Sequence, residues 1–230
     1  KTNLSNILSQ ASQTLAIRVP SHPVALDLLE KVKVPILAPS ANKSGGVSPT
    51  SANHAKDDFG PHYKGKDWVL EKILDYGVCE VGIESTVVDC RDETPIILRH
   101  GAITANMIFN ATNIKVLTLN KTQELISPGL LKSHYAPNAQ VLLNQKRKIN
   151  DSGWLTFGKI PKLLQKQENM FNLSPDGNLI QAGKLLYSGL RFLDSTGVKI
   201  IQVMTIPKVG IGIAINDRLT RASSSKEKII

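Results

Sequence analysis

The chain has 230 residues, of which 41% are hydrophobic and 20% charged, and a net charge of +9 at neutral pH. This length predicts one large or two modest domains, and the apolar fraction is sufficient for a buried core. No apolar run approaches the roughly 20 residues that a membrane-spanning helix needs. The composition therefore argues against a helical membrane protein.

The basic excess lies entirely in the second half of the chain. Residues 1–119 contain 12 basic and 12 acidic residues, for a net charge of 0, whereas residues 120–230 contain 16 and 7, for a net charge of +9. Its densest parts are residues 146–148 and the lysines at 159, 162 and 166. An RNA-facing or nucleotide-facing surface is possible, but the absence of interleaved aromatic residues favours a plain solvated surface.

The remaining composition offers little chemistry of its own. Cys79 and Cys90 form no CxxC pair, so we expect two reduced, structural thiols, which fits a cytoplasmic protein. The five histidines are scattered without metal-ligand spacing, and no nucleophile–base set is recognisable. The sequence therefore assigns no catalytic nucleophile and no protein-held metal.

The first elements in chain order form a predicted β-α-β unit. Residues 15–19 and 34–37 are expected to be buried strands. Between them, Ser21 is a plausible N-cap and Pro23 a first-turn proline of an amphipathic helix. A parallel strand pair with a crossover helix is the natural arrangement.

The next elements are a hairpin and a short helix. Residues 83–90 and 95–99 are the expected strands, and the turn between them lies at residues 91–93. Thr104 is expected to cap a helix that runs toward Phe109. Residues 112–137 lack sustained periodicity and are predicted to be a linker.

The remainder alternates again between strands and helices. Strands are expected at residues 140–143, 154–157 and 199–205, and helices at residues 178–193 and 214–222. This alternation predicts a second, small α/β domain with a mainly parallel sheet.

The segment from Ala38 to Thr50 is the most informative part of the chain. It places three hydroxyl groups, an amide and a glycine pair between an expected strand and an expected helix. Such a turn can bind an anion through backbone N–H groups and the helix N-terminus. Ser48 and Pro49 would then be the cap and the first-turn proline. An ordinary capped loop is the alternative, and the spacing is not that of a P-loop.

Four ordered motifs resemble those of the Sua5/YciO/YrdC family. Ser-Ala-Asn-Lys-Ser-Gly followed by Ser-Pro-Thr, within residues 40–50, resembles its signature. Residues 15–20 resemble its V-R-x-P segment, and residues 82–104 its G-x-E-S-T-V-V-D…I-L-R-x-G-x-I-T run. Ser-Pro-Gly and His-Tyr-Ala-Pro, within residues 127–137, resemble the linker of the longer Sua5-type members. Residues 216–219 also resemble a Sua5 terminus.

The resemblance implies a fold and an activity. The fold would be α/β: the C-terminal part of a YrdC-like twisted mixed sheet at residues 1–111, a linker or lid at residues 112–137, and a small Rossmann-like domain at residues 138–230. The activity would be that of a nucleotidyltransferase, threonylcarbamoyl-AMP synthase, which uses ATP with Mg²⁺, L-threonine and bicarbonate. Its product would serve a tRNA-modifying threonylcarbamoyl transferase, and RNA contact is possible.

The resemblance also implies roles for individual residues. Those matched to ATP are Thr14, Ser40, Ser48, Arg99, His134 and Tyr135, and those matched to threonine are Arg18, Ala38 and Ser85. Alternatives remain open for four of them. Arg18 could form a structural ion pair with Glu84, and Thr14 could be a plain strand-edge residue. Ser85 could be a core or edge serine, and Tyr135 could be a packing anchor. Asn42 is expected to hold the loop by bonding its own backbone.

One departure from the family bears on activity. The family's P-T-E-T-x-Y-G-L segment and its phosphate-gripping basic segment are not found in these 230 residues. We therefore expect this chain by itself to be a poor or inactive synthase. The alternative is a non-catalytic nucleotide-binding or RNA-binding remnant. A YrdC-like domain of carbamoyl-transfer machinery fits less well, because the linker is of the Sua5 type and zinc-finger cysteines are missing.

Overall fold

The computed structural model describes residues 14–60, 70–118, 134–147, 149–162 and 168–224. The chain divides into two compact units, Lys1–Pro39 and Ser40–Ile230. None of the described helices combines the length and apolar content that crossing a bilayer requires.

The first unit contains one described helix, α2 (Pro23–Val32). The helix was predicted, but its N-cap is His22 rather than Ser21, without a side-chain cap bond. The two predicted strands beside it are wrong, because residues 15–19 and 34–37 have no strand structure. A strand needs a hydrogen-bonding partner, and neither segment pairs with another in the described part of the chain. Their apolar side chains are exposed, with Val19 87% exposed.

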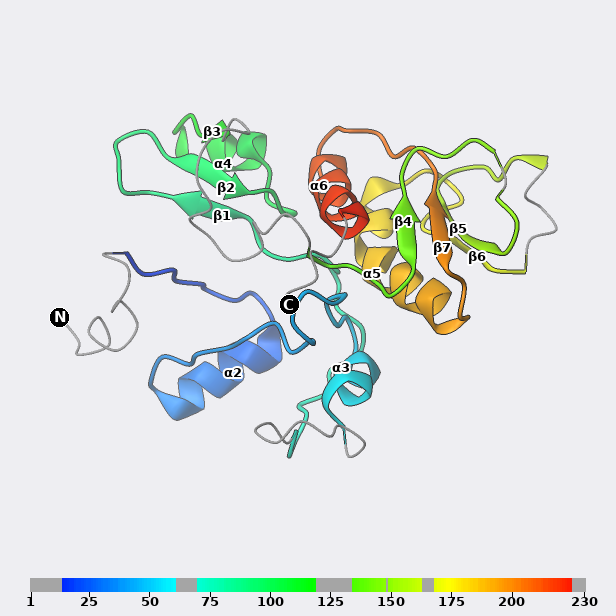
Figure 1. Ribbon diagram of the computed structural model, residues 1–230. Coiled ribbons are helices and arrows are strands. Elements are labelled where there is room, and N and C mark those ends of the chain that lie inside the picture. The colour runs from blue at the N-terminus through cyan, green and yellow to red at the C-terminus, as the bar shows by residue number, and fades with distance from the viewer. Residues whose placement is uncertain (1–13, 61–69, 119–133, 148, 163–167, 225–230) are drawn as a thin grey trace, which may run out of the picture. The chain divides into compact units, whose positions relative to one another are not determined.

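The first sheet of the second unit has the order β1-β2-β3 (Figure 1). Strand β1 (Val87–Asp89) pairs antiparallel with β2 (Ile96–Arg99), as the predicted hairpin requires, and β2 pairs in parallel with β3 (Leu117–Thr118). Strand β1 is shorter than the predicted 83–90, and its register shifts between Val87 and Val88. Helix α3 (Ala52–Phe59) precedes this sheet in sequence, and α4 (Ala105–Thr112) lies between β2 and β3.

The caps of these two helices differ in how well they were predicted. Thr104 caps α4 as expected, because its hydroxyl accepts a hydrogen bond from the Met107 N–H. Helix α3 is capped by Ser51 and not by Ser48. The reason is that Ser48 is already engaged elsewhere, as described below.

The second sheet has the order β4-β7-β5-β6 and is parallel throughout. Its strands are β4 (Gln140–Leu142), β5 (Ser152–Thr156), β6 (Met170–Asn172) and β7 (Ile200–Val203). The parallel sheet was predicted, whereas β6 was not. Helix α5 (Leu179–Ser195) packs against β5 and β6, and α6 (Gly212–Ser223) against β4 and α5 (Figure 1).

The main hydrophobic core lies between this sheet and its two helices. It includes Leu155, Leu186, Leu190 and Ile201, each at most 1% exposed. Two residues from earlier in the chain, Val47 and Ile83, join the same core. Burying an aliphatic side chain of this size contributes roughly 1.5–3 kcal/mol. The signature loop and the G-x-E-S-T-V-V-D run are therefore anchored to the C-terminal α/β layer.

Candidate functional site

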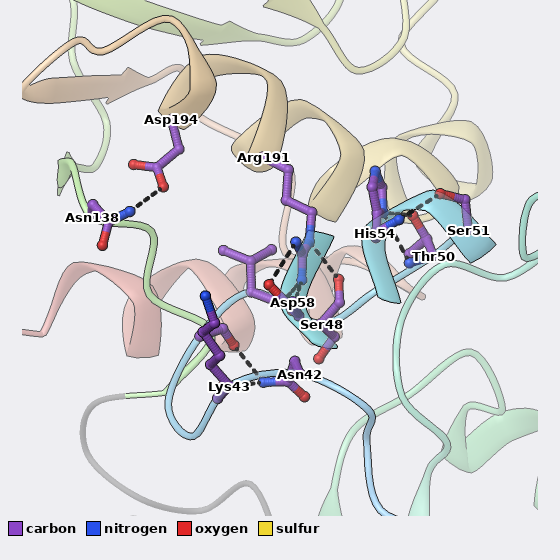
Figure 2. Close-up of polar contacts among 12 residues, drawn as sticks. Asn42, Lys43, Ser48, Thr50, Ser51, His54, Asp58, Asn138, Arg191 and Asp194 are labelled. Atoms are coloured by element: carbon purple, nitrogen blue, oxygen red, sulfur yellow. Dashed lines mark hydrogen bonds and ion pairs between the residues drawn. The ribbon is translucent and has the colours of Figure 1, made fainter. Parts of the chain in front are cut away.

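The signature loop is held in a tight turn by its own asparagine. Ala41 (φ 53°) and Gly45 (φ 72°) adopt left-handed backbone conformations, which glycine accepts without steric cost. The Asn42 Nδ2 donates to the carbonyls of Lys43 at 2.8 Å and Gly46 at 3.0 Å (Figure 2). The role predicted for Asn42 is confirmed.

A side chain of helix α5 holds the end of this loop in place. The guanidinium of Arg191 donates to the backbone carbonyls of Val47 and Ser48 and forms an ion pair with Asp58 of α3, at 2.6 Å (Figure 2). Carbonyls that would otherwise be buried without partners are thereby satisfied. One arginine thus fixes both the loop and the helix that follows it.

A second contact joins Thr50 to the same helix. The Thr50 hydroxyl lies 3.0 Å from that of Ser188, and the Thr50 N–H donates to Nδ1 of His54 at 3.1 Å. That nitrogen accepts only in the neutral ring. Burial lowers the pKa of His54, and the charge of Arg191 lowers it further against the opposing effect of nearby aspartates. The neutral ring is therefore favoured.

Glu84 is the centre of the polar network below the loop. Its Oε1 accepts from the Ser48 hydroxyl at 2.6 Å. Its Oε2 accepts from the Tyr187 hydroxyl and from Arg218 Nε, both at 2.8 Å. Burial raises the pKa of Glu84, but the charge of Arg218 and these hydrogen bonds outweigh it, so the net pKa is lowered. The carboxylate is ionised at neutral pH.

Arg218 of α6 is fully buried, at 0% exposure. Besides Glu84 it pairs with Asp217 at 2.8 Å, and its guanidinium carbon lies 5.4 Å from the centre of the Tyr135 ring. Burial lowers the pKa of Arg218, but the charge of Glu84 more than reverses this, so the net pKa is raised. A buried arginine is tolerated here because it is paired.

The end of the predicted linker passes over the same network. Tyr135 is 1% exposed and its ring stacks on that of Tyr187 with centres 5.6 Å apart. The ring of His134 meets it edge-on at 4.1 Å, and the Ala136 N–H donates to the Gly45 carbonyl at 3.0 Å. The linker end, the signature loop and helix α5 therefore meet at one place.

Arg99 supports the strand segment after Glu84. It is 7% exposed, and its Nε and Nη2 donate to the Ser85 carbonyl at 3.1 and 3.0 Å. Gly101 lies against the backbone of the same segment: a Cβ added to this glycine would stand 2.3 Å from the Thr86 nitrogen. The backbone at residues 84–86 is thus fixed from both sides.

Both halves of the chain match families of known proteins. Residues 1–101 match the Sua5/YciO/YrdC family, described as "Telomere recombination", and residues 103–224 match "Threonylcarbamoyl-AMP synthase, C-terminal domain". The chain belongs to the Sua5 family.

Three curated relatives are named threonylcarbamoyl-AMP synthase. Those of Bacillus subtilis and Pyrococcus abyssi are each 32% identical, over 97% and 94% of this chain, and that of Schizosaccharomyces pombe is 33% identical over 96%. The crystal structure of P. abyssi Sua5 complexed with L-threonine superposes with a TM-score of 0.75 at 29% identity over 90% of this chain. The chain spans 67%, 66% and 60% of the three relatives, and 63% of the solved one.

The structure brings together only some of the residues that the Sua5 resemblance singled out. Tyr135 and Ser48 lie in the network around Glu84, the Ser85 carbonyl is bound by Arg99, and His134 is half-buried against Tyr135. Ser40 and Ser85 are both exposed residues.

The other three belong to the Lys1–Pro39 unit and are described only within it. Arg18 and Ala38 are exposed, and Thr14 is half-buried. The expectation that Arg18 lies inside a buried strand is wrong, because residues 15–19 form no strand. Glu84, offered as its alternative partner, is instead bound by Ser48, Tyr187 and Arg218.

Sequence reasoning missed three residues that hold the signature loop and Glu84 in place: Tyr187, Arg191 and Arg218. A signal for Arg218 was present, because it falls at helical spacing with the buried apolar residues Ala214, Ile215 and Ala222. A charge on the apolar face of a helix requires a partner. Tyr187 and Arg191 are four residues apart on α5 and thus share one face.

Two further expectations concern thiols and metals. Cys79 and Cys90 are both free but exposed, so they are not core thiols. Within the described ranges no group of three or more His, Cys, Asp or Glu side chains could hold a metal ion.

Proposed function

We propose that this chain carries out the synthase reaction of its named relatives: L-threonine, bicarbonate and ATP give threonylcarbamoyl-AMP, pyrophosphate and water. The observation that carries the proposal is the match to both Sua5 family domains, over residues 1–101 and 103–224. The product would supply a threonylcarbamoyl transferase that modifies adenosine in tRNA, in the cytoplasm.

The chemistry of this reaction suits the groups present. A carboxylate oxygen of carboxylated threonine attacks the α-phosphorus, and pyrophosphate leaves with the electrons of the broken P–O bond. No covalent nucleophile is required, so catalysis rests on positioning and on electrostatic stabilisation. The pinned signature loop and the buried cation Arg99 are groups of that kind.

We propose that two sets of residues bind the substrates. ATP would be bound by Thr14, Ser40, Ser48, Arg99, His134 and Tyr135, and threonine by Arg18, Ala38 and Ser85. Three buried polar atoms around Tyr135 support a ligand there. These are Tyr135 Oη, His134 Nδ1 and Arg218 Nη2, and each lacks a hydrogen-bond partner among the described residues. Buried polar atoms are normally paired, with protein, water or ligand.

We propose that Mg²⁺ arrives with the triphosphate and is not held by the protein alone. Magnesium is commonly bound by one or two carboxylates together with substrate phosphates. Glu84 does not suit this role, because both of its oxygens already accept hydrogen bonds. When bound, the ion would neutralise charge on the phosphates.

The predicted division into a catalytic part (1–111), a linker (112–137) and a C-terminal domain (138–230) is also a proposal. The two sheets are separate, at residues 87–118 and 140–203, which supports two domains, but β3 (Leu117–Thr118) falls inside the predicted linker. A contact of the exposed basic residues Lys146, Arg147 and Lys159 with RNA is a further possibility.

The test is pyrophosphate release from ATP, with threonine or bicarbonate omitted as controls. We expect release that depends on both and is slow compared with that of a full-length relative. Arg18→Ala should raise the KM for threonine by about 10- to 100-fold, since a charge-assisted hydrogen bond is worth about 1.5–3 kcal/mol. Lys31→Ala removes an exposed cation from the same unit and should leave the KM unchanged. ATP binding without threonine-dependent turnover would instead favour the non-catalytic remnant.

A further inference from the structure

The hydrogen bond between Ser48 and Glu84 fixes the direction in which Ser48 can bond. The two oxygens lie 2.6 Å apart. An ionised carboxylate only accepts hydrogen bonds, so Ser48 must donate its single hydroxyl proton to Glu84. The serine therefore has no proton left for any other group.

The Ser48 oxygen can still accept hydrogen bonds. A hydroxyl has one donor and two acceptor lone pairs. Phosphate oxygens of ATP at neutral pH are themselves acceptors, so they offer this serine nothing. The donors of ATP are the two ribose hydroxyls and the exocyclic amine of adenine. These are the groups that a hydroxyl in this state can bind.

The carboxylate is held in place by the C-terminal helices. Tyr187 of α5 and Arg218 of α6 both donate to Oε2, which leaves Oε1 for Ser48. Tyr187 is 1% exposed and Arg218 is 0% exposed, so neither side chain is free to turn into solvent. The orientation of the Ser48 proton thus depends on residues more than 100 positions away in the sequence.

We propose that Glu84, held by Tyr187 and Arg218, makes Ser48 an obligate hydrogen-bond acceptor, so that this serine recognises a ribose hydroxyl or the adenine amine and not the phosphates. The inference rests on the proposed function, because it takes ATP as the ligand of Ser48. Glu84, Tyr187 and Arg218 are positioning residues that act through the serine.

The first experiment compares nucleotide analogues by calorimetric titration of the full chain. The ligands are ATP, its 2′-deoxy and 3′-deoxy forms, and the purine ribonucleoside triphosphate that lacks the amine. EDTA is present, so that no metal-bound water can donate. Ser48→Ala should weaken ATP binding about 5- to 10-fold. With one of the three analogues, variant and wild type should bind equally.

Each other outcome has a distinct meaning. If Ser48→Ala weakens all four ligands by the same factor, the serine contacts the phosphates and the inference is overturned. If Ser48→Ala leaves ATP binding unchanged, the serine makes no contact and the inference also fails. If the wild-type chain binds none of the nucleotides, it is the proposed function that fails.

The second experiment tests the positioning role with a double-mutant cycle. Tyr187→Phe removes one hydroxyl and keeps the ring that stacks on Tyr135. It should weaken ATP binding in the wild type but cause no further loss in Ser48→Ala, because its effect passes through the serine. Ser195→Ala, an exposed hydroxyl on the same helix, should change neither affinity. Equal losses from Tyr187→Phe in both backgrounds, or no loss in either, would overturn the positioning role.

Discussion

Replacing Arg218 by methionine should destabilise the fold severely. The substitution removes a charge with 0% exposure and leaves the Glu84 carboxylate, whose side chain is 15% exposed, with hydrogen bonds from only Ser48 and Tyr187. Breaking a buried ion pair by removing one partner typically costs about 3–5 kcal/mol. Since domains of this kind are stable by only about 5–15 kcal/mol, the expected loss is a large part of the total.

The measurement is urea unfolding, followed by circular dichroism and by the fluorescence of the buried Trp154, which is 1% exposed. Adding Glu84→Gln removes the unpaired charge, so the double variant should recover about 2 kcal/mol relative to additivity. If the free energy of unfolding of Arg218→Met lies within about 0.5 kcal/mol of the wild-type value, the reasoning is refuted. A loss that small is typical of a solvent-exposed ion pair and not of a buried one.

Three other changes have defined outcomes. Gly82→Ala should cost more than Gly77→Ala, because both have positive φ but only at Gly82 would the Cβ meet a neighbour, a carbonyl of α5 at 2.4 Å; equal urea midpoints would contradict this. Folding lowers the pKa of Glu84, so its contribution is present above about pH 4.3 and is lost as the pH falls through the folded-state value. Wild type should therefore lose more stability than Glu84→Gln between about pH 5 and pH 3, and parallel curves would count against it. Arg191→Met should cost about 1–3 kcal/mol because it leaves Asp58 and two carbonyls unpaired, which equilibrium unfolding would measure, and a neutral result would show that the clamp is dispensable.

The helices and strands could be predicted where they are determined by neighbouring residues or by sequence periodicity. Thr104 was predicted as a cap, and its side chain accepts from the first N–H groups of α4; Asn178, predicted as the first residue of a helix, caps α5 in the same way. The parallel sheet follows from the alternation of strands with helices α5 and α6. These features depend on neighbours in sequence or on periodicity.

The prediction failed where the outcome depends on distant partners. Ser48 resembles a cap followed by proline, but its hydroxyl is used by Glu84, so the cap moves to Ser51. Residues 15–19 and 34–37 have the composition of strands but no pairing partner in the described chain. The resemblance supplied the candidate site residues, whereas Tyr187 and Arg218, which hold Glu84, make long-range contacts that no local pattern encodes.

The contacts of Glu84 and Ser48 also affect when this site can form during synthesis. Arg218 follows Glu84 by 134 residues, and Arg191 follows Ser48 by 143. At about 5–20 residues per second, a ribosome needs about 7–27 s to reach Arg218 after Glu84 has been made. Arg191 is made within that interval, whereas the Glu84 carboxylate lacks its Arg218 partner throughout it. Helix α6 therefore completes a polar network whose central carboxylate is made 134 residues earlier.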